Sequence, residues 1–105
     1  MEEISNNGNS VLKLEGRIDL SNYFVLGDKL QDFYEKGCHS IILDFSLLTS
    51  IDSLGLGQLL LFNNKLKKRD GELKIINVTS RYIREMFETI QLDKIITIKP
   101  GPALK

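Results

Sequence analysis

The sequence predicts an α/β domain with a mixed, largely parallel sheet of four to five strands and three helices. Short apolar runs of strand character alternate along the chain with longer segments of helical periodicity. Successive strands joined through a helix run parallel, because the crossover returns the chain to the edge of the sheet where it started. The chain has 105 residues, so we treat residues 1–105 as a single domain.

The amino-terminal segment has the pattern of a β-hairpin. A short strand around 2–5 and a longer strand over 10–17 flank the run Asn6-Asn7-Gly8-Asn9, which is a strong turn signal. We therefore expect residues 1–9 to form a short strand and its turn. At the other end, Pro100-Gly101-Pro102 predicts a frayed tail over residues 99–105.

Three later segments place apolar residues at helical spacing. The stripes are Tyr23, Leu26, Leu30 and Phe33; Leu59, Phe62 and Leu66, widened by Leu56 and Leu60; and Ile83, Met86, Phe87 and Ile90. Suitable caps and stops flank them: Ser21 or Asn22 before the first, Gly37 after it, Arg69-Asp70-Gly71 after the second, and Thr79 or Ser80 before the third. The second helix is expected to run to about Lys68.

The remaining apolar runs predict strands between and after these helices. The run 41–45 is apolar except at Asp44, which is typical of a central strand covered on both faces. Alternating apolar residues predict a further strand over 73–78, and a last short strand is expected over 95–98.

The charge balance argues against a nucleic-acid or anionic-membrane partner held mainly by electrostatics. Lys and Arg together number 14, as do Asp and Glu, so the formal net charge is zero. The basic run 65–69 lies at the end of the second predicted helix, where cations suit the helix dipole. We interpret it as a solvated helix terminus.

The sequence also bears on location. No stretch approaches the roughly 18 apolar residues of a membrane span, and the acidic start lacks a signal-peptide pattern. We therefore expect a cytoplasmic protein without membrane insertion. The single cysteine, Cys38, allows no intramolecular disulfide and is expected to be a half-buried structural thiol.

Residues suited to catalysis are few. The sole histidine, His39, adjoins the sole cysteine, and Cys38-His39 is not the spacing of a nucleophile and its base. One His and one Cys do not make a typical zinc site. We therefore predict no catalytic residue, no metal and no cofactor.

The run Gly55-Leu56-Gly57 does not match the phosphate-binding loops. A dinucleotide fingerprint needs a third glycine where Leu60 stands. A P-loop needs Gly-Lys-Ser/Thr, but Gln58 follows Gly57. Ser53 is also outside a Gly-x-Ser-x-Gly elbow, because residue 51 is isoleucine.

Ser53 nevertheless stands out, because it comes just after a strand, at the predicted start of a helix. Two interpretations remain open. Either Asp52 or Ser53 caps the helix by accepting a bond from a free N–H, or Ser53 is exposed and can be modified. Phosphorylation would add about −1.5 to −2 charges at pH 7, which would disturb a docked partner far more than the fold.

The motifs together resemble the STAS domain family, and especially the bacterial anti-sigma factor antagonists. The matching segments are 14–19 (Leu-Glu-Gly-Arg-Ile-Asp), 41–45, 51–57 (Ile-Asp-Ser-Leu-Gly-Leu-Gly), 71–73 and 92–96. The resemblance covers about residues 10–98 in order.

The resemblance implies a function. Antagonists of this family bind an anti-sigma factor that is also a serine kinase. Phosphorylation of the serine after the motif's aspartate releases the partner, and a phosphoserine phosphatase restores binding. That serine is Ser53 here. The implied partner-binding residues are Asp52, Ser53, Leu54, Gly55, Leu56 and Gly57, with Asp19 and Ser21 beside them.

This chain departs from the family motif at Leu54, where the family usually has Ser or Thr. An apolar side chain there suits a protein contact, and it leaves open whether partner choice differs and whether regulation uses the ordinary kinase. Two other functions also remain as alternatives. One is an unphosphorylated scaffold subunit of a signalling or lipid-transport complex, with Ser53 acting only as a cap. The other is a protein that binds a small ligand or nucleotide.

Overall fold

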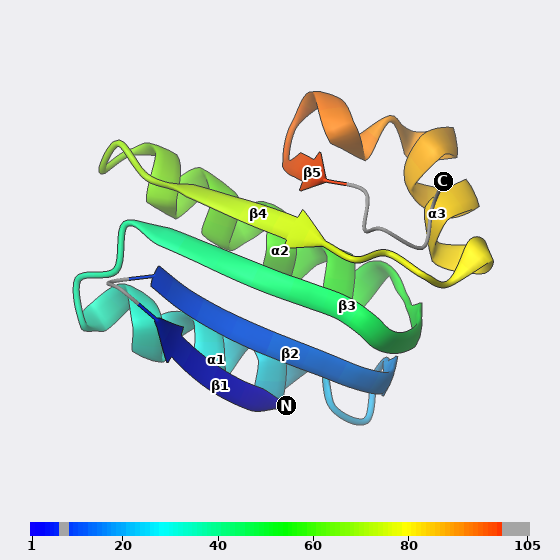
Figure 1. Cartoon of the computed structure of the whole chain (residues 1–105), viewed down its shortest axis with the longest axis horizontal. Coiled ribbons are helices and arrows are strands. Elements are labelled where there is room, and N and C mark those ends of the chain that lie inside the picture. Colours follow the sequence, from blue (N-terminus) through cyan, green and yellow to red (C-terminus); the bar gives the residue numbers. More distant parts are fainter. Residues whose placement is uncertain (7–8, 100–105) are drawn as a thin grey trace.

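In a computed structural model, residues 1–6 and 9–99 form a five-stranded sheet, three α-helices and one short 3-10 helix (Figure 1). The strands are β1 (Glu2–Asn6), β2 (Asn9–Ile18), β3 (Ser40–Ile51), β4 (Glu72–Ile76) and β5 (Thr97–Lys99). Their order in the sheet is β1-β2-β3-β4-β5. β1 is antiparallel to β2, and the other neighbouring pairs are parallel. The predicted fold class is confirmed. The turn at 7–8 and the tail at 100–105 lie outside the described residues.

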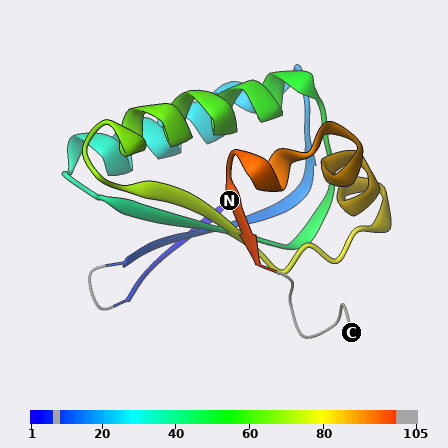
Figure 2. The ribbon, with the colours of Figure 1, turned by 90° about the horizontal axis from the view of Figure 1, so that it is seen from above.

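The helices are α1 (Tyr23–Glu35), α2 (Ser53–Lys67) and α3 (Arg81–Ile90), followed by the 3-10 helix η1 (Leu92–Lys94). Strands β2 to β5 follow one another in chain order, and right-handed crossovers taken in that order place their helices on the same face. Figure 2 shows α1 and α2 side by side over one face of the sheet. The other face of β3 is only half-buried at Ile42, Asp44 and Ser46, so the expectation of a strand covered on both faces is wrong.

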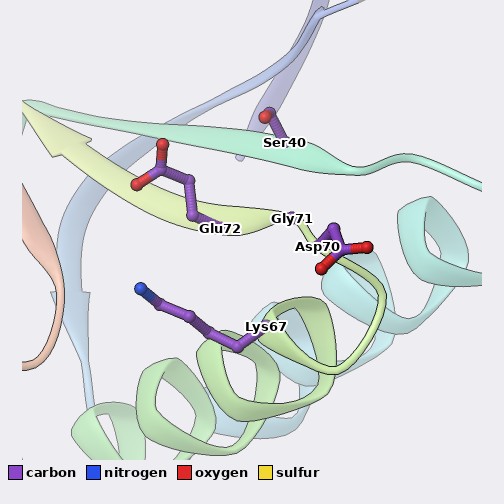
Figure 3. A pocket seen from close by; sticks show the side chains of 5 residues that line it. All are labelled: Ser40, Lys67, Asp70, Gly71 and Glu72. Atoms are coloured by element: carbon purple, nitrogen blue, oxygen red, sulfur yellow. The ribbon is translucent and has the colours of Figure 1, made fainter.

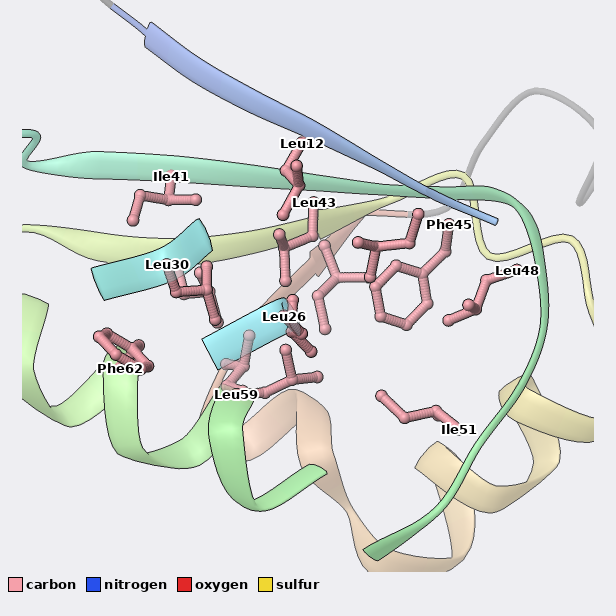
Figure 4. Close-up of a cluster of buried hydrophobic side chains, with 14 of the residues drawn as sticks. Leu12, Leu26, Leu30, Ile41, Leu43, Phe45, Leu48, Ile51, Leu59 and Phe62 are labelled. Atoms are coloured by element: carbon pink, nitrogen blue, oxygen red, sulfur yellow. The ribbon is translucent and has the colours of Figure 1, made fainter. Parts of the chain in front are cut away.

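The core lies between this helical layer and the sheet. Leu26 and Leu30 of α1 and Leu59 of α2 point toward Leu43 and Phe45 of β3 (Figure 4), and all five are fully buried. The helical stripes read from the sequence are therefore largely the buried faces. The prediction is wrong for Leu60 and Ile90, which are 40% and 45% exposed on flanks of α2 and α3 that no described element covers.

Three strands differ from their predicted limits. β4 ends at Ile76 and not at residue 78, because Asn77 has a left-handed backbone (φ 58°) that interrupts the extended chain. β3 continues six residues past Phe45, because β2 stays paired with it to the end and Ile18 lies opposite Ile51. Thr79 and Ser80 also donate hydrogen bonds to carbonyls of this extension, at 2.9 and 3.3 Å. β5 begins at Thr97, because η1 occupies the preceding residues and leaves Ile95 exposed.

Candidate functional site

The residues singled out by the sequence gather where β2 and β3 end. Ile18 and Ile51 are paired at the carboxyl ends of these two parallel strands. The Asp52 amide then donates a hydrogen bond to the Ile18 carbonyl at 3.0 Å. The loop that begins at Asp19 therefore lies beside the start of α2.

Asp52, and not Ser53, is the N-cap of α2. Its backbone is extended, and its carboxylate accepts hydrogen bonds from the amides of Leu54 and Gly55 at 3.0 and 3.2 Å. Ser53 is the first helical residue and is exposed. Within residues 1–6 and 9–99, the structure shows no hydrogen bond made by the Ser53 hydroxyl. Of the two capping candidates left open by the sequence, the aspartate has the structural role.

The neighbouring loop is ordered by its own side chains. The Asp19 carboxylate accepts hydrogen bonds from the Ser21 amide at 2.9 Å and from the Ser21 hydroxyl at 2.6 Å. These bonds, with a smaller contribution from the charge of Arg17, lower the pKa of Asp19 below its ordinary value of 3.8. Asn22 holds the other side, since its side-chain amide donates to the Arg17 carbonyl at 2.7 Å. Ser21 is therefore a support for Asp19 and not a helix cap.

The two glycines of the motif have different environments. A Cβ atom on Gly55 would lie 2.6 Å from Ile51 Cγ1 and 2.8 Å from Ile18 Cγ2, so only glycine lets α2 start this close to the sheet. A Cβ atom on Gly57 would meet nothing within 4 Å. Glycine inside a helix costs roughly 0.5–1 kcal/mol relative to alanine. The fold therefore explains Gly55 and does not explain Gly57.

The site also carries exposed apolar side chains. Leu54 is 38% exposed, and Leu20 in the adjacent loop is 73% exposed. On α1, Phe24 is 53% exposed. Leu20 and Phe24 were not among the residues predicted for this face. The sequence could have indicated both residues, because Leu20 follows Asp19 in a loop and Phe24 lies outside the apolar stripe of α1.

Not all of the predicted residues form the surface itself. Gly55 is buried, and Leu56 is half-buried against the core. These two residues position the helix start from beneath. The surface is made by Asp19, Ser21, Asp52, Ser53, Leu54 and Gly57, all of which are at least partly exposed.

A second hollow lies at the opposite edge of the sheet, where Lys67, Asp70 and Gly71 close on the start of β4 (Figure 3). Two carboxylates line it, from Asp70 and Glu72, and that of Glu72 is already bound within the fold. It accepts a hydrogen bond from the Thr97 hydroxyl at 2.9 Å and pairs with Lys74 at 3.8 Å.

Other site types receive no support from the described part of the chain. Its residues contain no group of three or more His, Cys, Asp or Glu side chains that could hold a metal ion. None of its helices has the length and apolar character needed to cross a membrane. Ligand crevices of open α/β sheets form where the strand order reverses, and the order of the five described strands has no reversal.

Comparison with known proteins identifies the family. Residues 3–98 match the family model described as Mlab, STAS domain, so the chain belongs to the STAS domain family. No curated protein is similar enough to the sequence to count as a match.

Solved structures share the fold at low sequence identity. The crystal structure of Thermotoga maritima TM1081 has a TM-score of 0.85 at 19% identity and covers 98% of this chain and 86% of its own. An anti-sigma factor antagonist from Mycobacterium paratuberculosis has a TM-score of 0.81 at 21% identity, covering 98% and 85%. Phosphorylated SpoIIAA from Bacillus has a TM-score of 0.71 at 23% identity, covering 92% and 87%. These similarities establish the STAS fold.

Proposed function

We propose that this protein is a cytoplasmic anti-sigma factor antagonist, a binding module and not an enzyme. It binds an anti-sigma factor with serine kinase activity through the Asp19–Ser21 loop and the start of α2. Phosphorylation of Ser53 releases the partner, and a phosphoserine phosphatase restores binding. Two of the structures with the same fold are of anti-sigma factor antagonists, and one of these is also known in a phosphorylated form.

The observation that carries this proposal is the division of roles between Asp52 and Ser53. Asp52 supplies the cap of α2, so the exposed Ser53 hydroxyl is free of that role. A kinase can therefore modify Ser53 without removing a bond that holds the helix. The positive end of the helix dipole also favours negative charge at this position, which offsets part of the repulsion from Asp52.

A phosphate at Ser53 would act on the partner and hardly on the fold. It would place a doubly charged group beside the Asp52 carboxylate and the exposed Leu54 side chain. When a partner is docked on this surface, repulsion between like charges and the loss of the phosphate's hydration both weaken binding. Since about 1.4 kcal/mol corresponds to a tenfold change in affinity, a cost of several kcal/mol would make binding negligible.

The test is a binding titration with the purified anti-sigma factor kinase of the source organism. Ser53→Asp should abolish binding while the far-UV spectrum and the melting temperature stay near those of wild type. Leu60→Asp is the matched control, because it adds the same charge to an exposed position on another flank of α2. Wild-type binding by Ser53→Asp would refute the charge switch.

A direct assay of modification complements the titration. Incubation with the kinase and ATP should add the mass of one phosphate, and peptide mapping should locate it at Ser53. Ser53→Ala should remove the mass gain, whereas Ser80→Ala should keep it, because the Ser80 hydroxyl is engaged as the cap of α3.

A second candidate is an unphosphorylated scaffold subunit of a signalling or lipid-transport complex. The observation that favours it is Leu54, an exposed apolar side chain directly after Ser53 that suits a permanent protein contact. This candidate predicts no phosphate on Ser53 in the kinase assay. It also predicts a partner that Ser53→Ala binds as tightly as wild type.

A further inference from the structure

We propose that the docking face extends from the start of α2 at Ser53 (the Ser53 turn) into the groove between α1 and α2. An amphipathic helix of the anti-sigma factor fills this groove. The inference rests on the proposed function and adds to it the shape and chemistry of the partner's contact. The groove has a volume of about 320 Å³. It lies beside the Ser53 turn, because α1 begins at the carboxyl end of β2 and α2 begins at the carboxyl end of β3.

The two helices approach closely enough to give this groove a defined floor. A Cβ atom on Gly27 of α1 would lie 2.5 Å from Oε1 of Gln58 on α2, so glycine lets the Gln58 side chain lie against α1. Further along both helices, the Lys65 ammonium donates a hydrogen bond to Oε1 of Gln31 at 3.1 Å. These contacts hold α1 and α2 side by side, as Figure 2 shows.

Large apolar side chains line the groove and remain in contact with solvent. Phe24 of α1 is 53% exposed and Leu61 of α2 is 47% exposed. Exposed apolar groups that meet in one depression mark contact sites for proteins. Leu60, the neighbour of Leu61, has nearly the same exposure but does not line the groove.

Gly57 connects this groove to the Ser53 turn. Leu54, Gly57 and Leu61 recur at i, i+3 and i+7, so they share one face of α2. Gly57 weakens the helix, and within residues 1–6 and 9–99 nothing lies within 4 Å of where its Cβ atom would be. A bare stretch of backbone between two leucines permits a second helix to come close, because the separation of packed helices depends on the side chains between them.

The chemistry of the partner helix follows from the stripe of Leu54, Gly57 and Leu61. Two turns beyond Leu61 the stripe reaches Lys68, and Lys65 lies beside it at the end of the groove. A helix that complements this surface has one apolar face, for the leucines and Phe24, and carboxylates at the end that lies over the lysines. Asp28 of α1 also lines the groove, so the helix places a neutral or basic side chain against it.

The main experiment compares Leu61→Glu with Leu60→Glu in titrations against the anti-sigma factor kinase. Truncation of a central apolar contact typically weakens binding by about 30-fold, and we expect at least that for Leu61→Glu. Leu60→Glu should stay within about threefold of wild type, as is usual for residues outside the energetic centre of an interface. Because both residues are exposed leucines of α2, the pair separates docking from effects on folding.

Two further variants test the bare helix surface and the basic end. Gly57→Ala should weaken binding by about tenfold without lowering the melting temperature. Lys68→Glu should weaken binding more than Lys67→Glu, since Lys67 lies on the other flank of α2.

The outcomes are distinct. If wild type does not bind the kinase, the proposed function fails, and this inference fails with it. If wild type binds and Leu61→Glu binds equally well, only the groove is refuted. If the chain alone forms a dimer that Leu61→Glu dissociates, the groove joins two copies, and the partner-helix proposal is overturned.

Discussion

The amide of Asp52 donates a hydrogen bond of 3.0 Å to the carbonyl of Ile18, and this bond joins the cap of α2 to the end of β2. Because Asp19 follows Ile18 and Ser53 follows Asp52, two loops distant in sequence form one surface. The cap also uses the Asp52 carboxylate for the helix. These relationships lead to four predictions about the fold and the site.

Asp52→Ala should destabilise the protein by about 1 kcal/mol, because it removes the acceptor for the Leu54 and Gly55 amides. Ser53→Ala should change the free energy of unfolding by less than about 0.5 kcal/mol, as is usual for surface substitutions. Urea unfolding of the two variants measures both values. A larger loss for Ser53→Ala than for Asp52→Ala would mean that the serine is the effective cap.

Gly55→Ala and Gly57→Ala should have opposite effects on stability. A methyl group at position 55 would clash with Ile51 and Ile18, and overpacking of this kind costs about 1–3 kcal/mol. At position 57 the methyl group meets open space, and the better helix propensity of alanine should stabilise by about 0.4–1 kcal/mol. Thermal unfolding of both variants would decide this, and a destabilised Gly57→Ala would point to a structural need for that glycine.

Ser21→Ala should raise the pKa of Asp19 toward 3.8, because the Ser21 hydroxyl is the largest contribution to its lowered pKa. A carboxyl whose pKa is depressed in the folded state stabilises that state above its unfolded pKa. The contribution is lost as the pH falls through the folded value. The ordered loop should therefore persist at pH 5 and loosen in more acidic solution. An NMR titration of the Asp19 carboxyl group reports this pKa, with Ser53→Ala as the variant that should leave it unchanged.

Asn63→Ala should destabilise the protein by about 1–3 kcal/mol, because it removes the side-chain acceptor of the buried Leu73 amide. The Asn63 side chain accepts from the Leu73 amide at 3.4 Å and donates to the Ile95 carbonyl at 3.2 Å. Its neighbour Asn64 is exposed, so Asn64→Ala is the matched control. Equal unfolding free energies for the two variants would contradict a structural role for Asn63.

Much of the fold could be predicted from local patterns. The stripe of Leu26, Leu30 and Phe33 is the buried face of α1, and the turn signal at 69–71 does end α2. Where the prediction failed, the deciding contact came from elsewhere in the chain. Polar Ser46 ends the apolar run after Phe45, yet β3 continues there because β2 remains paired with it, and Thr49 adds a hydrogen bond to the Gly16 carbonyl at 2.8 Å.

The candidate site likewise has features that the sequence predicted and features that only the tertiary structure decided. The order of residues in Ile51-Asp52-Ser53-Leu54-Gly55-Leu56-Gly57 was enough to exclude the phosphate-loop templates and to select Ser53, because those templates depend on spacing along the chain. The sequence could not decide between Asp52 and Ser53 as the cap, since either side chain can accept the bond. That choice depended on which residue has extended backbone at the end of β3, and this is set by the pairing of β3 with β2. Tertiary structure also separated Gly55 from Gly57, because only the packing of α2 against Ile18 and Ile51 shows which glycine the fold requires.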